Sequence, residues 1–404
     1  MNKIFFIFFF VSAISFGCSD NGKKSDGGDN GPGGILAAVY VDAKHGSDNH
    51  AGDSWDNAVR TIAKGINLAT QNGAVVYLAA GTYKGTGDFN LDFNGKNIHL
   101  TSVSGPENCI IDCQGYLLDY PAWPECGFSR RAFYFHSGET DQAIVEGITI
   151  VNARTYEGDG GGIHISGASP VIKNCIIRNC MVTCTVDLIP RDYNGEGGGV
   201  RAGGGLVIDC IIENNTGILG AGLFLGGTAR AVNCLIDGNY INGPHGGIGA
   251  GIYATDFAQV VNCTVVDNYI TQGSISFNMC GGGIAACSFA VVNNTLIWNN
   301  ILYVYDCVGM IGGSQLYVYS SGNVGISHCQ LPDNDGDIYG ISVSAFDNCV
   351  FDAPVYESGY IPAAGSAGVD KGSEEYLTGI TEDLAGNPRK HGDAVDIGVY
   401  ERQD

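Results

Sequence analysis

Charged residues are scarce in this chain of 404 residues, and basic residues are the scarcest. Asp and Glu number 42 against 20 Lys and Arg, the net charge is −22, and charged residues make up only 15% of the chain. Proteins that bind nucleic acid need a basic surface, so this balance argues against a nucleic-acid partner. An anionic polysaccharide remains open, because a local basic patch can bind one and calcium can bridge two anionic surfaces.

Common catalytic motifs are missing as well. The sequence contains no Walker A loop, no HExxH motif and no GxSxG elbow, which leaves phosphate-binding, zincin and serine-esterase functions without support. Proline is rare at 11 residues, whereas glycine reaches 62. Glycine at this level without a strict third-residue period is not collagen. Together with 45% apolar residues it predicts many short strands joined by tight turns.

A long apolar run stands at the N-terminus. Lys3 precedes the apolar residues 4–16, a run too short to span a bilayer, and the stretch ends at Gly17 and Cys18. This resembles a bacterial lipoprotein signal, in which Cys18 is lipidated; the alternative is an ordinary signal peptide with a chance cysteine. We therefore expect residues 1–17 to be a signal peptide and residues 18–34 a flexible tether. The mature protein would be an outer-membrane lipoprotein at the cell surface, with the periplasmic face as the alternative.

A phrase recurs five times between residues 160 and 300. Each copy has a Gly run, an apolar residue, a polar stretch, Asn or Asp before Cys or Asn, an alternating strand and a closing Asn, as in GAGIYATDFAQVVNCTVVDNY, residues 249–269. The third glycine of each run falls at positions 162, 199, 222, 251 and 283. A repeat too short to bury its own apolar face must stack on its neighbours. The phrase therefore predicts one coil of a parallel β-helix.

The cysteines and asparagines fit the same coil. Of the 15 cysteines, five follow Asn or Asp at one place in the strand phrase and predict a ladder of small buried side chains: Cys175, Cys210, Cys234, Cys263 and Cys349. Two further pairs are candidates for disulfides in an exported protein, Cys113 with Cys126 and Cys180 with Cys184. The closing asparagines would turn a corner of the coil and stack along it: Asn179, Asn214, Asn239, Asn268 and Asn299.

The open ends of a solenoid must be covered. Residues 56–71 predict an amphipathic helix suited to cover the N-terminal end, with one apolar face formed by Val59, Ile62, Ala63, Ile66 and Ala69. We divide the chain into an N-terminal cap with the first coils, residues 35–108, a β-helix, residues 109–352, and a C-terminal capping segment, residues 353–404.

The stretch YVDAKHGSDNHAGDSWDNAVRTIAKGINLAT, followed by VVYLAAGTY, resembles the opening of pectin-lyase-like right-handed β-helix proteins. The Gly-run phrases are similar to the repeats of polymorphic outer membrane proteins, and VDIGVYE resembles the end of many such exported proteins. The resemblance covers residues 38–404 and implies an all-β, right-handed parallel β-helix. It does not select a chemistry, since the superfamily holds lyases, hydrolases, epimerases and non-catalytic adhesins.

The long insertions all fall at one corner of the coil, so stacking places them along one edge, where loops on a rigid scaffold collect binding residues. Their aromatic and charged side chains suit sugar rings and hydroxyls. The candidate saccharide contacts there are Tyr156, Glu157, Tyr193, Glu196, Tyr240, His245 and Tyr269. Beside them, an outward strand column contains His164, Arg201, Phe224 and Tyr253, and His164 is a further candidate saccharide contact. A second outward column, Arg178, Glu213 and Asp237, is interpreted as charge pairing on a solvated face.

Several roles remain open at this edge. A polyuronate lyase needs a base and a cation, for which Arg154, Arg191 and Arg201 are the candidates, with calcium held by Asp159, Asp187 and Asp192. A glycoside hydrolase needs two carboxylates, from the same three Asp residues and Glu196. No stretch matches a named catalytic signature, so the sequence favours a monomer that binds glycan without catalysis, with protein adhesion as a further alternative. A catalytic protein predicts Arg and carboxylates converging beside the insertions, and an adhesin predicts a broad face without a buried charged cluster.

Overall fold

The computed structural model describes residues 37–115, 129–156, 158–183, 195–243, 246–272, 279–303, 311–319, 323–333, 336–340, 346–377 and 379–403. The chain divides into two units, residues 1–34 and 35–404, and every described residue belongs to the second. The signal peptide, Cys18 and the tether lie outside the described residues. Within those residues, the helices are too short or too polar to cross a membrane.

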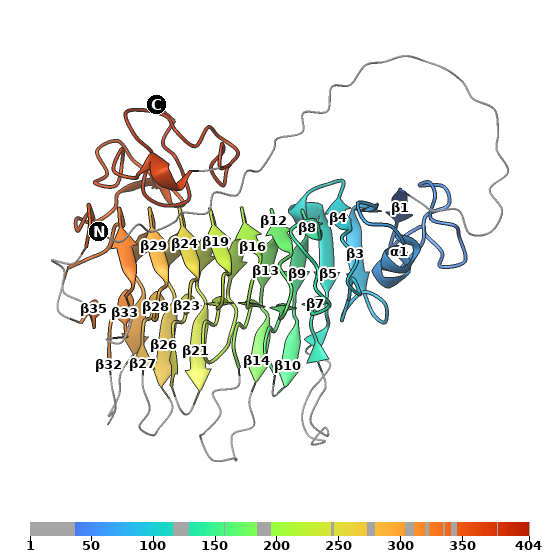
Figure 1. Cartoon of the computed structure of the whole chain (residues 1–404), viewed down its shortest axis with the longest axis horizontal. Helices are drawn as coiled ribbons and strands as arrows, with labels where there is room; N and C mark the ends of the chain where they lie inside the picture. Colours follow the sequence, from blue (N-terminus) through green and yellow to red (C-terminus); the bar gives the residue numbers. More distant parts are fainter. Residues whose placement is uncertain are drawn as a thin grey trace, which may run out of the picture. The chain divides into compact units, whose positions relative to one another are not determined.

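Three long parallel sheets, A, B and C, form the body of the unit (Figure 1). Sheet A contains β1 (Ala38–Val41), β2 (Val75–Leu78), β4 (His99–Ser102), β8 (Ile144–Glu146), β12 (Val171–Lys173), β16 (Leu206–Ile208), β19 (Arg230–Val232), β24 (Gln259–Val261), β29 (Val291–Asn293) and β34 (Gly325–Ser327). Sheet B contains β3 (Gly81–Lys84), β5 (Cys109–Asp112), β9 (Thr149–Val151), β13 (Ile176–Arg178), β17 (Ile211–Glu213), β20 (Leu235–Asp237), β25 (Thr264–Val266) and β30 (Leu296–Trp298). Sheet C contains β7 (Phe133–Phe135), β11 (Ile163–Ile165), β15 (Val200–Ala202), β18 (Leu223–Leu225), β23 (Ile252–Ala254), β28 (Ile284–Ala286), β33 (Leu316–Val318) and β35 (Ile338–Tyr339).

Smaller elements complete the coils. Sheet D is a column of short strands after sheet B: β6 (Ser129–Arg130), β10 (Arg154–Tyr156), β14 (Met181–Thr183), β21 (Tyr240–Gly243), β26 (Tyr269–Gln272) and β31 (Ile301–Tyr303). Sheet E precedes sheet C and contains β22 (Gly247–Ile248), β27 (Met279–Cys280) and β32 (Ile311–Gly312). The other elements are α1 (Ile62–Leu68), the 3-10 turns η1 (Pro106–Asn108) and η4 (Glu374–Tyr376), and the hairpin of β36 (Tyr356–Ser358) and β37 (Ile361–Pro362).

A complete coil visits sheets C, A, B and D in turn, as β11, β12, β13 and β14 do, and strands of the three long sheets pair with their equivalents one coil on; among the described residues, the coil of β15, β16 and β17 has no strand in sheet D. Inward positions such as Ile163, Ile172 and Ile177 are fully buried, which explains the alternating pattern of the sequence. The Gly runs stand where successive coils approach closely. A Cβ on Gly251 would lie 2.6 Å from the carbonyl oxygen of Gly283, so no larger residue fits there. The predicted parallel β-helix is confirmed.

The cysteine ladder is present in the core. Cys175, Cys210, Cys234 and Cys263 are buried just before strands of sheet B. Thr295 takes the next position, and the column then continues with Cys329 and the partly buried Cys349. The sequence pattern missed Cys329 because His328, rather than Asn or Asp, precedes it. The proposed disulfides stay predictions, because Cys126 and Cys184 lie outside the described residues.

The asparagines form two columns where the sequence suggested one. Asn179, Asn214 and Asn299 have left-handed backbone at φ 55°, 56° and 55° and turn the corner as predicted. Asn239 and Asn268 lie one position further on, where they are completely buried.

These two belong to an internal ladder formed by Asn215, Asn239, Asn268 and Asn300. The Nδ2 group of Asn239 donates to Asn268 Oδ1 at 3.0 Å, and that of Asn268 donates to Asn300 Oδ1 at 2.9 Å. The same oxygens accept backbone N–H groups of the preceding coil, as Asn268 Oδ1 does from Asn239 at 2.9 Å. Each buried amide therefore joins two coils.

The N-terminal helix is shorter than the predicted residues 56–71. It begins after Thr61, whose side chain accepts the N–H of Lys64. Asp48 fixes the preceding turn, because its carboxylate accepts the N–H groups of Arg60 and Thr61 at 2.9 Å each. Val59 is buried as expected, but in a bridge to Val41 of β1 instead of a helix.

The C-terminal segment differs from the expected end cap. Its Ile380 packs on Val232 and Val261 of sheet A, and its Val399 packs on Leu235 and Val266 of sheet B. These strand residues point outward and are apolar, so they require a cover. The segment consequently lies along the flank of the middle coils, where Val399 N–H also donates to Thr264 Oγ1 at 3.0 Å.

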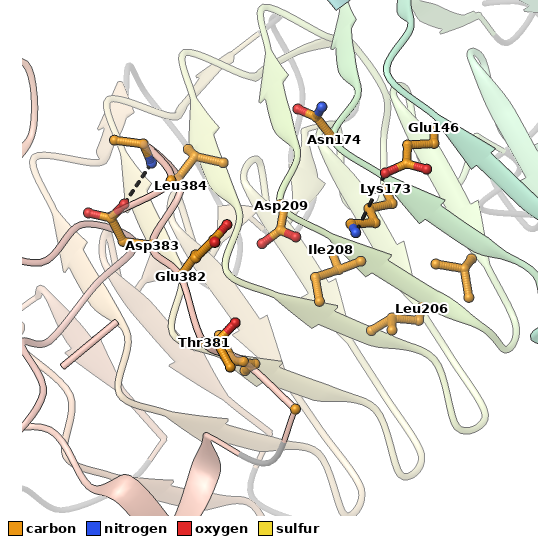
Figure 2. A pocket seen from close by; sticks show the side chains of 15 residues that line it. Glu146, Lys173, Asn174, Leu206, Ile208, Asp209, Thr381, Glu382, Asp383 and Leu384 are labelled. Carbon is orange, nitrogen blue, oxygen red and sulfur yellow. Dashed lines mark hydrogen bonds and ion pairs between the residues drawn. The ribbon is translucent and has the colours of Figure 1, made fainter. Parts of the chain in front are cut away.

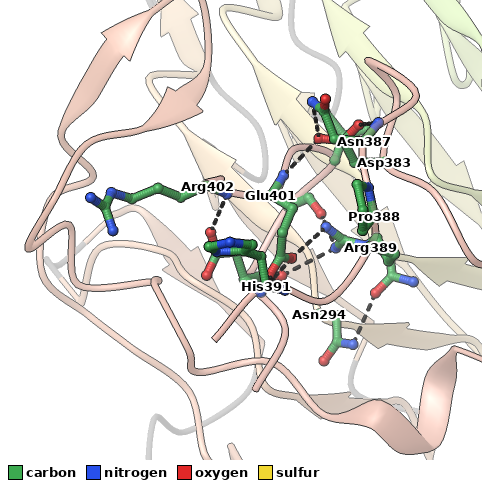
Figure 3. Close-up of polar contacts among 12 residues, drawn as sticks. Asn294, Asp383, Asn387, Pro388, Arg389, His391, Glu401 and Arg402 are labelled. Carbon is green, nitrogen blue, oxygen red and sulfur yellow. Dashed lines mark hydrogen bonds and ion pairs between the residues drawn. The ribbon is translucent and has the colours of Figure 1, made fainter. Parts of the chain in front are cut away.

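Buried charges hold this segment together (Figure 3). The guanidinium of Arg389, 1% exposed, donates to Glu401 Oε2 at 3.2 Å and to the carbonyl oxygen of Asp396 at 3.1 Å. Glu401 also accepts the N–H groups of His391 and Asp396 at 3.0 Å each. Burial raises the pKa of Glu401 to about 7, against the opposing effect of these contacts.

Candidate functional site

The described strands that lead into the insertions end at one edge of the coils. The strands of sheet D end at Thr183, Gly243, Gln272 and Tyr303, and in each coil the chain returns through sheet E or directly to sheet C. These strand ends lie along the lower edge of Figure 1. The outer faces of sheets C and D therefore flank the insertions.

An outward column runs along sheet C beside this edge. The strand register places one residue per coil in it: Tyr134, His164, Arg201, Phe224, Tyr253, Ala285, Tyr317 and Tyr339. Neighbouring side chains stack, with 5.0 Å between the ring centres of Tyr134 and His164 and 5.3 Å between those of Phe224 and Tyr253. The guanidinium of Arg201 lies 5.5 Å from the ring centre of Phe224. The column is charged and polar at one end and mainly aromatic at the other, where Phe224, Ala285 and Tyr317 are buried beneath Leu219, Ile248 and Cys280.

Charged groups converge at the first coils of this column. Arg201 Nε donates to Glu196 Oε2 at 3.1 Å, and each side chain is 22% exposed. Asp159 Oδ1 accepts the backbone N–H of Glu196 at 3.2 Å. The structure thus brings together three residues that the sequence had nominated separately.

Arg131 is a fourth member of this charged cluster, and the sequence reasoning missed it. Its guanidinium donates to the carbonyl oxygen of Asp159 at 3.1 Å and lies 5.2 Å from the ring centre of Tyr134. Its Nε is buried without a hydrogen-bond partner among the described residues. The backbone N–H of Ala132 donates to the carbonyl oxygen of Gly162 in the next coil. The segment RRAF, residues 130–133, therefore aligns with GGGI, residues 160–163. That alignment was the signal by which the sequence could have pointed to Arg131.

Burial shapes the electrostatics of the cluster. It raises the pKa of Glu196, and the nearby Asp159 raises it further, while Arg201 acts in the opposite direction. The pKa of His164 falls to about 3 through burial first and then through Arg131 and Arg201. His164 is therefore uncharged at neutral pH. Perturbed groups gathered on one surface mark a candidate functional site.

Arg154, Tyr156, Tyr240 and Tyr269 lie on sheet D, apart from this cluster. The guanidinium of Arg154 lies 4.9 Å from the ring centre of Tyr156. Tyr240 and Tyr269 stack with 5.3 Å between ring centres and an angle of 9° between their planes. Stacked in this way, the two rings cover each other's faces and leave mainly edges for a ligand.

The other nominated residues lie outside the described part of the chain: Glu157, Asp187, Arg191, Asp192, Tyr193 and His245. Of the three candidate calcium ligands, only Asp159 is among the described residues. Within the described residues no group of three His, Cys, Asp or Glu side chains could hold a metal ion. The calcium site stays a prediction.

The geometry assigns different chemical capacities to these groups. Arg201 already donates through Nε to Glu196 and through a terminal nitrogen to the carbonyl oxygen of Ile165 at 3.2 Å. It is therefore placed to hold a partner and is poorly placed to act as a base. The Asp159 carboxylate accepts the backbone N–H of Glu196 and acts electrostatically on the Glu196 carboxylate, and Arg131 adds a half-buried positive charge beside them.

Comparisons with known proteins address the fold. Residues 127–296 match a family described as right handed beta helix region. Similar solved structures include a pectate lyase (TM-score 0.44, 15% identity, 90% of this chain and 96% of that chain) and a rhamnogalacturonan lyase (0.41, 13%, 90% and 97%). Pectin methylesterase PemA from Erwinia chrysanthemi is also similar (0.40, 12%, 78% and 93%).

No curated protein sequence matches the chain. The identities to the solved structures are too low to transfer an activity. The family match agrees with the stacked parallel coils. The chain is a right-handed parallel β-helix protein.

Proposed function

We propose that the protein is an exported, lipid-anchored surface protein that binds an acidic polysaccharide along the outer face of sheet C. The observation that carries this proposal is the half-buried cluster of Arg131, Asp159, Glu196 and Arg201 beside the insertions. Half-buried charges are costly unless they serve a partner or each other. Arg131 lies half-buried in this cluster, and its positive charge would attract a sugar carboxylate.

The length of the charged end of the column supports a ligand longer than one sugar ring. This end includes the strands of Tyr134, His164 and Arg201, and at about 4.8 Å per strand it extends roughly 10 Å. Beyond it, Phe224 and Tyr317 are only 7% and 3% exposed and pack against Leu219, Ile248 and Cys280, so they support the site from below. Export and anchoring are supported by the apolar run before Cys18. Fatty-acid labelling of whole cells tests the anchor, and a protein that takes up no label would remove it.

Loss of the Arg201 side chain should weaken polysaccharide binding. We expect Arg201→Ala to lower the affinity for a uronate-containing polysaccharide at least tenfold, because it also frees Glu196 to repel the ligand. Titration calorimetry on a soluble form that begins at residue 18 with Cys18→Ala measures this. The matched control is Arg178→Ala, which breaks an equivalent pair with Glu213, 3.4 Å, on the outer face of sheet B. Equal losses in both variants would place the ligand elsewhere.

A second candidate function is hydrolysis of the bound polysaccharide, and the electrostatic interaction of the Asp159 and Glu196 carboxylates favours it. A cluster of converging Arg and carboxylate side chains is expected for a catalytic protein and is not expected for an adhesin. Glu196, whose pKa is raised, would be the proton donor.

The cleavage test follows reducing ends and the ultraviolet absorbance of unsaturated sugar ends across a panel of uronate polysaccharides. For a hydrolase we expect reducing ends without absorbance, and a loss of more than about a hundredfold in Glu196→Gln. Glu213→Gln on sheet B should leave the rate unchanged. Absorbance would indicate a lyase instead, and two flat traces would leave binding alone.

A further inference from the structure

A second cleft lies on another side of the coils, outside the site on sheet C. It has a volume of about 580 Å³ and lies between the outer face of sheet A and residues 379–386 of the C-terminal segment (Figure 2). This volume falls within the usual range of small-ligand sites. The floor is apolar and consists of Val171, Leu206, Ile208 and Ile380.

Both walls of the cleft are fixed to the same framework. Asn233, completely buried, donates through Nδ2 to Asp209 Oδ1 at 2.7 Å on one wall and to the carbonyl oxygen of Glu382 at 3.3 Å on the other. Ile380 packs on Val232 and Val261 beneath them. A ligand therefore meets a preformed cleft and need not order it, which favours binding.

The rim carries more negative than positive charge. Figure 2 shows the Asp209 carboxylate between Lys173 and Glu382, and both act on it electrostatically. The ammonium of Lys173 pairs with Glu146 at 3.5 Å, and Glu146 also bonds to His99 at 2.8 Å. Asp383 turns away from the cleft and accepts the N–H groups of Ala385, Asn387 and Glu401.

The carboxylates of Glu146, Asp209 and Glu382 thus face the single ammonium of Lys173, which is already paired with Glu146. Uronates and phosphates are repelled by such a rim, whereas a positively charged group between Asp209 and Glu382 would relieve their mutual repulsion. An apolar floor beneath polar groups suits the C–H face of a sugar ring with its hydroxyls at the rim.

We propose that this cleft binds an amino sugar, with the ring on the floor formed by Leu206 and Ile208 and the ammonium group between Asp209 and Glu382. The ligand differs in charge from the acidic polymer assigned to sheet C. The two sites consequently recognise different parts of one glycan, or two glycans, and each can be tested without the other.

The test uses the soluble form with Cys18→Ala and titration calorimetry at neutral pH. The probes are the glucosamine disaccharide, its N-acetylated form and the galacturonic acid disaccharide. We expect the glucosamine disaccharide to bind at least tenfold more tightly than the acetylated form, and the galacturonic acid disaccharide not to bind in this cleft.

Asp209→Asn is the decisive variant, and we expect it to weaken glucosamine binding at least tenfold. Asp209 has left-handed backbone at φ 54°, and asparagine already occupies the equivalent corner at Asn174, Asn233, Asn262 and Asn294, so the change should fold. The matched control is Asp256→Asn, an exposed left-handed position at φ 59° at the corner between sheets C and A.

Equal affinity for the free and acetylated disaccharides would overturn the proposal. Equal loss in Asp209→Asn and Asp256→Asn would overturn it too. Arg201→Ala should leave glucosamine binding unchanged, and this separates a failure of the cleft from a failure of the site on sheet C.

Discussion

Arg389→Met should lower the stability of the C-terminal segment by about 3–5 kcal/mol, the cost of removing one partner of a buried ion pair. Arg389 and Glu401 are both almost completely buried, and Arg389 is the cation that faces the Glu401 carboxylate. Without it, Glu401 must take up a proton or remain charged without its partner. Hydrogen exchange of residues 379–403 measures the effect, because the segment can detach while the coils persist.

The matched control is Lys390→Met, at the neighbouring position. Lys390 forms an exposed pair with Glu374, and exposed pairs contribute little to stability. The double variant Arg389→Met with Glu401→Gln should recover part of the loss, because no buried charge is then left without its partner. A double variant as unstable as Arg389→Met alone would show that packing, and not charge, holds the segment.

Asn268→Ala should destabilise the coils to a similar extent. Its Oδ1 accepts both the backbone N–H and the Nδ2 of Asn239, and its Nδ2 donates to carbonyl oxygens of Ile236 and Val266. Each buried donor or acceptor left without a partner costs about 1–3 kcal/mol. Loss of a single methyl-sized contact would cost far less.

Thermal unfolding followed by circular dichroism measures this prediction. Asn214→Ala is the matched control, since Asn214 is exposed at the corner and its loss should cost only about 1–2 kcal/mol for the left-handed backbone. A midpoint for Asn268→Ala no lower than that of Asn214→Ala would mean that water replaces the missing amide between the coils.

The coil could be predicted from the sequence because every copy repeats the same constraints. Small residues stand where backbones meet, apolar residues alternate inward, and the length varies at a single corner. The two asparagine columns could not be told apart in the sequence. Some coils end their strand with NN and others with NY, and in both an Asn follows the strand, but the two columns are offset by one residue. Only the structure shows that Gly238, at φ 61°, takes the left-handed corner position in place of Asn239.

The candidate site was only partly predictable. His164, Arg201 and Phe224 were expected in one column because the Gly runs align them. Arg131 was missed because its coil has no Gly run to mark the register. The flanking position of the C-terminal segment could not be foreseen, since it depends on the outward Val232, Leu235, Val261 and Val266, which in sequence look like ordinary strand residues.

The C-terminal segment also changes how the coils depend on one another. In a stack that has only nearest-neighbour contacts, the last coil can fray and each loss exposes the next one. Here Asn294 bonds to Ser373, Thr264 to Val399 and Asn233 to Glu382, so three successive coils share one strap of chain. Ser327 of the following coil also bonds to Tyr376, so fraying from the end requires release of the strap, which gives these coils an all-or-none character that a simple solenoid lacks.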